Sequence, residues 1–331
     1  MAATRYQRWL SPKFVIGESY GTTRAAALAS HLQQATGLDL VGVVLLSSAL
    51  DFQTFSPGEG NDLPYALALP SFTAAAWYHK KIAADPAQAL TEVEHWALTE
   101  YTTALAQGDV LASAERDHII ARMAEFTGLS ANYLQTSRLR VRPPRFAKEL
   151  LRGEDRTLGL LDSRVKGVDV SPRGEFPEYD PAMFLVTGPY VATFNDYVRR
   201  DLKYETTLRY EFLSQEAHDS WSYAPGGQGY LYVGNRLAEA MSRDSRLQVF
   251  AGAGCYDLTT PYLSQKYTLD HLELDPSLRG HLTFKVYQSG HQICTDIPSL
   301  RALKSDLAAF VRSGRAPASS PPAKGKPGAR P

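Results

Sequence analysis

The 331-residue sequence predicts an α/β fold with a mostly parallel sheet. Near the N-terminus, a β-type run at 13–18 precedes an Ala- and Leu-rich helical stretch at 22–34 and a continuous apolar run at 41–48. Strand, helix and strand in such close succession are typical of a βα unit in a parallel sheet. Near the C-terminus, two further β-type runs, 246–251 and 281–288, lead into polar loops.

The first elements follow from local chemistry. The run KFVIGE at 13–18 is a compact β-type run, and the helix after it is predicted to stop before Gly37, because glycine commonly terminates helices. The run VGVVLLSS at 41–48 has no polar alternation, which is typical of a strand that is buried on both faces.

The middle of the chain has a helical pattern. Asp85 is a predicted N-cap with Pro86 at the first helical position, and apolar residues follow at helical spacing. A second helix is predicted from about Ser113 to Gly128, and a third begins after Ser130. Residues from about 53 to 165 therefore look mostly helical, and the pattern weakens over 167–232. Residues 298–312 are predicted to form an amphipathic closing helix.

These patterns divide the chain into four predicted parts. They are a first core segment at 1–52, a mainly helical cap insertion at 53–240, a second core segment at 241–312 and a disordered, proline-rich tail at 313–331.

Composition excludes several classes of function. The chain has 35 basic and 35 acidic residues, which gives no support for nucleic-acid binding. No apolar run reaches the length of a membrane span, so we expect no membrane partner. The opening MAATRYQRWL has no signal-peptide core, which leaves the compartment undetermined. No metal-binding or nucleotide-binding motif occurs, and we expect no cofactor and no metal.

The pentapeptide Gly17-Glu18-Ser19-Tyr20-Gly21 fits G-x-S-x-G, a turn that presents a nucleophilic serine above a parallel sheet. A strand before the motif and a helix after it are the context that this turn requires, and both are predicted. The two glycines are expected because backbone and helix crowd the turn. The alternative is a serine in an ordinary βα turn.

A serine nucleophile needs a base and a group that orients the base. Asp257 and His291 follow the last two predicted strands, where the sites of open sheets form. The seven other histidines lack this placement, although His218 and His271, in predicted loops, stay open as candidates. The alternative for Asp257 is an Asx-turn residue, and for His291 it is a structural role.

With these residues placed, the sequence resembles the serine carboxypeptidases of the α/β-hydrolase fold, particularly their bacterial members. The resemblance is carried by GESYG, by Gly254-x-x-Asp-Leu-Thr-Thr-Pro261, by Ser289-Gly-His291, by Leu161-Asp-Ser-Arg164 and by 76–81, and it covers about 5–312. It implies removal of C-terminal residues from peptides through an acyl-enzyme. Ser19 would be the nucleophile, His291 the general base, Asp257 its orienting carboxylate, and the backbone N–H of Tyr20 an oxyanion-hole donor.

The resemblance also gives Glu18 a role, which is to help hold the free carboxylate of the substrate. A carboxyl group can do this only when a proton is shared between the acids, so we expect binding to weaken as the pH rises. The alternative is that Glu18 is a variable position of the motif.

Only 12 residues precede Lys13, whereas an α/β-hydrolase normally builds several strands before this turn, and the loop that carries a second oxyanion-hole donor. We therefore expect the N-terminal strands to be missing, and peptide hydrolysis by this chain alone to be weak. A missing N-terminal segment or a complementing chain is a possible partner. The open alternatives in function are another acyl-serine reaction, as in an esterase or acyltransferase, or a catalytically impaired remnant.

Cys255 and Cys294 lie close in sequence to Asp257 and His291 and are expected to be neighbours if those residues touch. A disulfide needs Cα atoms within about 7 Å, and two buried free thiols are the alternative that we favour.

Overall fold

The computed structural model describes residues 2–83, 85–222 and 229–314. Its centre is a four-stranded sheet with the strand order β1-β2-β5-β6, in which every neighbouring pair is parallel. The strands are β1 (Phe14–Glu18), β2 (Gly42–Leu46), β5 (Gln248–Gly254) and β6 (Leu282–Tyr287). The predicted α/β class and the four predicted strands are confirmed. The predicted tail lies, from residue 315 on, outside the described residues.

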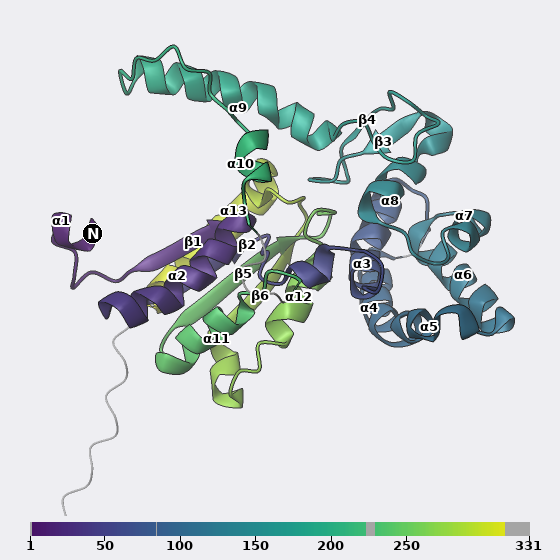
Figure 1. Ribbon diagram of the computed structural model, residues 1–331, viewed down its shortest axis with the longest axis horizontal. Coiled ribbons are helices and arrows are strands. Elements are labelled where there is room, and N and C mark those ends of the chain that lie inside the picture. The colour runs from purple at the N-terminus through teal and green to yellow at the C-terminus, as the bar shows by residue number, and fades with distance from the viewer. Residues whose placement is uncertain (1, 84, 223–228, 315–331) are drawn as a thin grey trace, which may run out of the picture.

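Helices cover both faces of this sheet (Figure 1). They are α2 (Tyr20–Thr36), α11 (Gly234–Arg243), α12 (Tyr262–Asp270) and α13 (Ile297–Ser313), and a short helix, α1 (Ala2–Arg5), precedes β1. Val43 and Leu45 pack in one core with α2 and α11, whereas Val44 packs in another with Leu303 of α13. The continuous apolar run of β2 is therefore explained by burial on both faces.

The chain between β2 and β5 builds a second body of helices. They are α3 (Leu63–Tyr78), α4 (Pro86–Trp96), α5 (Thr102–Gln107), α6 (Ser113–Thr127), α7 (Ala131–Thr136) and α8 (Pro143–Glu149), with a π-helical turn at Ala97–Tyr101 between α4 and α5. The predicted caps are confirmed: Asp85 accepts the N–H of Gln88, Ser130 accepts that of Tyr133, and Gly128 ends α6 with φ 68°.

Helix α3 forms the centre of this second body. It is buried along almost its whole length, as expected for a helix that is apolar on all sides. Phe72 stacks on Phe146 of α8 with ring centroids 4.0 Å apart. Helix α3 also packs against α12, which joins the helical body to the sheet.

The segment with a weak sequence pattern, 167–232, contains a long helix that the sequence analysis missed. After a small hairpin of β3 (Arg156–Leu158) and β4 (Lys166–Val168), helix α9 (Pro181–Arg200) extends away from the sheet, and α10 (Gln215–Asp219) leads back (Figure 1). Gly188 and Pro189 interrupt its pattern, and Phe184 is 76% exposed.

Candidate active site

Ser19 occupies a strained turn between β1 and α2. Its backbone has φ 54° and ψ −127°, a conformation that non-glycine residues rarely adopt. A Cβ on Gly17 would lie 2.2 Å from the carbonyl oxygen of Gly21, so glycine is required at position 17. A Cβ on Gly21 would meet nothing within 4 Å, so the expectation that crowding demands both glycines is wrong for Gly21.

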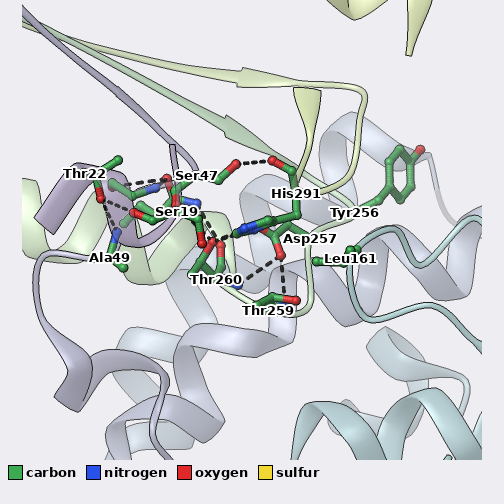
Figure 2. A network of polar contacts seen from close by, with 12 residues as sticks. Ser19, Thr22, Ser47, Ala49, Leu161, Tyr256, Asp257, Thr259, Thr260 and His291 are labelled. Atoms are coloured by element: carbon green, nitrogen blue, oxygen red, sulfur yellow. Dashed lines mark hydrogen bonds and ion pairs between the residues drawn. The ribbon is translucent and has the colours of Figure 1, made fainter. Parts of the chain in front are cut away.

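Hydrogen bonds hold this turn against the end of β2. The N–H of Ser19 donates to the carbonyl of Leu46 at 2.9 Å. The hydroxyl of Thr22 donates to the carbonyl of Ser19 at 2.6 Å and accepts the N–H of Ala49 at 2.8 Å (Figure 2). These bonds fix the strained backbone, and they place Ser19 at the carboxyl edge of the sheet.

His291 and Asp257 meet at the same edge. Nδ1 of His291 lies 2.7 Å from Oδ2 of Asp257, and both residues are buried. In Figure 2 the imidazole extends from the loop after β6 toward Thr260 and the Ser19 turn. Among the described residues no hydrogen bond joins the Ser19 hydroxyl to His291, and such contacts are often long in enzymes without substrate.

The carboxylate of Asp257 is fully hydrogen-bonded. Its Oδ1 accepts the N–H of Thr259 at 2.7 Å and that of Thr260 at 3.0 Å, and its Oδ2 accepts the Thr260 hydroxyl at 2.7 Å. Asp257 is therefore an Asx-turn residue and the partner of His291 at once. Thr260 is absent from the predicted site, although an Asp-x-x-Thr spacing is a signal for such a bond.

The two other candidate histidines, His271 and His218, have different hydrogen-bond partners. Nδ1 of His271 lies 2.7 Å from the carbonyl of Tyr267 at the end of α12. His218 is exposed in α10 with Nδ1 3.3 Å from Oδ1 of Asp219. The histidine that is bonded to Asp257 is His291.

The electrostatics of His291 favour its protonated form. Burial alone would lower the pKa of His291, but the surrounding acidic groups, led by the charge and hydrogen bond of Asp257, together outweigh burial and raise the pKa above its ordinary value of 6.5. The charges of Glu18 and Asp180 act in the same direction.

Glu18 ends β1 beside this pair. Glu18 as a whole is exposed. The protein atoms around its carboxyl group nevertheless remove part of the hydration of that group, which raises the pKa of Glu18 above the ordinary value of 4.5. The charge of Asp257 adds to the rise and the charge of His291 opposes it. The three groups thus lie close enough to influence one another's ionisation.

Tyr20, the first residue of α2, is oriented by a residue 201 positions away. The indole N–H of Trp221 donates to the Tyr20 hydroxyl at 2.8 Å, and the two rings meet edge to face. The guanidinium of Arg24 lies 5.2 Å from the Trp221 ring centroid. The sequence carries no local signal for this contact, because it depends on the return of the chain from α9.

The two cysteines are free thiols. Cys255 is buried, and burial raises its pKa to about 12. The prediction of free thiols is confirmed, but the expectation that both are buried is wrong, because Cys294 is exposed.

The described residues contain no group of three or more histidine, cysteine, aspartate or glutamate side chains that could hold a metal ion. Within the same residues, no helix combines the length and apolar character that crossing a bilayer requires.

The site is thus a serine on a strained turn, beside a buried His–Asp pair and a carboxyl group of raised pKa. Comparison of the sequence with models of protein families and with curated proteins found no match.

Proposed function

We propose that this chain is a serine-type carboxypeptidase of α/β-hydrolase type, which removes C-terminal residues from peptides. The observation that carries the proposal is the buried 2.7 Å contact between His291 and Asp257 at the sheet edge where Ser19 is held with φ 54°. Strain of this kind is costly and is typical of functional positions.

In the proposed mechanism, Nε2 of His291 takes the proton of the Ser19 hydroxyl as Oγ attacks the carbonyl carbon of the last peptide bond. Asp257 holds the ring and stabilises the imidazolium that forms. The backbone N–H of Tyr20 donates to the developing oxyanion. The imidazolium then gives its proton to the leaving amine. Water, deprotonated by His291, attacks the acyl-Ser19 ester, and the imidazolium returns that proton to Oγ of Ser19 as the peptide acid leaves.

Glu18 supports the choice of a peptide with a free C-terminus. A carboxyl group whose pKa is raised stays protonated to a higher pH than an ordinary glutamate, and in that form it can donate a hydrogen bond to a substrate carboxylate. Once ionised, Glu18 would repel that carboxylate. An amidated peptide has no such charge, and its binding would not depend on the protonation of Glu18.

A second candidate is an incomplete site that needs a complementing chain. It is favoured by the exposed edge of the sheet, since among the described strands β1 pairs with β2 alone and Ile16 is 62% exposed. An esterase or acyltransferase would use the same three residues and differs from the first proposal in substrate alone.

The experiment has two stages. The wild-type chain and Ser19→Ala are treated with a fluorophosphonate probe, and labelling of the wild type alone supports an assembled nucleophile. An absence of wild-type labelling favours the incomplete site. Because the probe blocks Ser19, a fresh, unlabelled sample of the wild-type chain is then compared on matched free-acid and amidated peptides. A strong preference for the free acid supports the carboxypeptidase, and equal or better cleavage of amides and simple esters favours the other acyl-serine enzymes.

A further inference from the structure

One short segment of the second body, residues 160–164, lies against both loops that carry the His–Asp pair. On the loop of Asp257, the N–H of Leu258 donates to the carbonyl of Leu160 at 2.9 Å. The N–H and the hydroxyl of Ser163 both donate to the carbonyl of Tyr256 at 3.0 Å. The backbone on each side of Asp257 is therefore bonded to this segment.

The same segment holds the loop of His291. The N–H of His291 itself donates to the carbonyl of Leu161 at 2.6 Å, and Figure 2 places Leu161 beside this loop. A Cβ on Gly290 would lie 2.3 Å from that carbonyl oxygen, which explains why glycine precedes the histidine.

Arg164 spans the two ends of the histidine loop. One Nη donates to the carbonyl of Gln288 at 2.8 Å and lies 3.2 Å from Oδ1 of Asp296. Asp162 fixes the guanidinium from the other side through contacts of 3.0 Å and 2.7 Å. The Arg164 side chain is only 18% exposed, and its guanidinium lies 5.0 Å from the ring centroid of Tyr256.

Asp180 holds the segment from a third direction. Its Oδ2 accepts the N–H of Leu161 at 3.1 Å, and its Oδ1 accepts that of Ala182 at 2.8 Å in the first turn of α9. Asp180, Leu161 and His291 thus form one continuous chain of hydrogen bonds.

We infer that Arg164 and Asp180 are positioning residues of the active site. Through the 160–164 segment they keep His291 and Asp257 in their positions relative to each other. The inference rests on the proposed function, because it assigns these residues to the Ser19 reaction. A planar, bidentate guanidinium holds several acceptors in a fixed geometry that a lysine ammonium cannot reproduce. Displacement of a reacting group by about 1 Å can cost about 10²-fold in rate.

The first test compares Arg164→Lys with Arg140→Lys. Arg140 is a matched control because it also pairs through two nitrogens with a carboxylate, that of Asp62, at 2.6 Å, and donates to a backbone carbonyl, that of Leu105. Both partners belong to the helical body, Asp62 directly before α3 and Leu105 within α5. Both variants are assayed for the rate of fluorophosphonate labelling of Ser19, for kcat and KM on an activated ester, and for Tm.

We expect Arg164→Lys to lower the labelling rate and kcat by about 10- to 100-fold with KM little changed, at a temperature where both variants are folded. Arg140→Lys is expected to keep the wild-type rate. A purely structural Arg164 would change Tm and leave kcat at the wild-type value, and that result would overturn the inference.

The second test uses Asp180→Asn, with Asp85→Asn as control because Asp85 caps α4 before a proline as Asp180 caps α9. An asparagine keeps one acceptor for the helix cap but presents an NH₂ group to the N–H of Leu161. We expect only Asp180→Asn to slow labelling and to weaken the downfield proton resonance of His291 Nδ1. An unchanged rate and resonance would contradict the inference.

If the wild-type chain itself is not labelled, the proposed function fails instead, so the failure of the inference and the failure of the proposed function are distinguishable.

Discussion

The α-carbon of Gly17 faces the carbonyl of Gly21 so closely that a methyl group on Gly17 would lie 2.2 Å from that oxygen. This contact lets β1 turn sharply into α2 and leaves Ser19 at the apex of the turn.

Gly17→Ala is therefore expected to force the turn open. Because the clashing atoms are backbone, we expect the free energy of unfolding to fall by about 1–3 kcal/mol and the labelling of Ser19 to be lost. Gly21→Ala is the control, since nothing lies within 4 Å of its Cβ, and alanine is favoured over glycine in a helix. Chemical denaturation of both variants checks the difference, and equal effects would contradict it.

The strained backbone at Ser19 is expected to lower the stability of the protein. Ser19→Gly relieves the positive φ, whereas Ser19→Ala keeps it, so the glycine variant is expected to be more stable than the alanine variant by about 1–3 kcal/mol. Both variants lack the proposed nucleophile. Urea denaturation with matched m-values measures the difference, and a glycine variant no more stable than the alanine variant would show that the turn stores no strain.

Thr260 is predicted to contribute to stability through its hydrogen bond to the buried side chain of Asp257. Thr260→Val removes a hydroxyl that donates to the carboxylate at 2.7 Å, which we expect to cost about 1.5–3 kcal/mol of unfolding free energy. Thr259→Val is the matched control, because Thr259 is exposed and contributes its backbone N–H, and its change is expected within about 0.5 kcal/mol. Thermal melts of the pair test the prediction, which a comparable loss in both variants would exclude.

The pH dependence combines two groups of raised pKa. His291 acts as a base only when neutral, so kcat is expected to rise with pH and to level off above the pKa of His291. Because that pKa is raised, the rise should occur at a higher pH than for an ordinary histidine. Glu18 donates a hydrogen bond only below its own raised pKa, so KM for free-acid peptides should increase as the pH rises through it. Steady-state kinetics from about pH 4 to 8 on free-acid and amidated peptides separates the two effects.

Glu18→Gln provides the control for this profile. The variant is expected to lose the pH dependence of KM, and the rise in kcat should move to lower pH because the Glu18 charge no longer raises the pKa of His291. If the variant kept the pH dependence of KM that the wild type has, Glu18 would not be the group that binds the substrate carboxylate.

Much of the core could be predicted from the sequence because its signals are local. The strand runs, the glycine stop at Gly37 and the caps at Asp85 and Ser130 lie where the structure has them. The spacing of strand ends also brought Asp257 and His291 to one edge of the sheet, since parallel strands align their carboxyl ends.

The remainder depends on contacts between distant parts of the chain. Helix α9 is not predicted by the sequence, because Gly188 and Pro189 interrupt its helical pattern and large apolar side chains on it are exposed. The bonds from Leu161 to His291 and from Trp221 to Tyr20 join residues more than 100 positions apart, and no periodicity or spacing encodes such pairs.

The bonds between the 160–164 segment and the loops of Asp257 and His291 have a consequence for protein engineering. The helical body is not an interchangeable module, since a chimaera that exchanged it would also remove the carbonyls and the guanidinium that hold the loops of Asp257 and His291. A transplanted body would have to bring its own copy of this segment in the same register. The geometry of the Asp257–His291 pair therefore depends on the helical body as well as on the sheet.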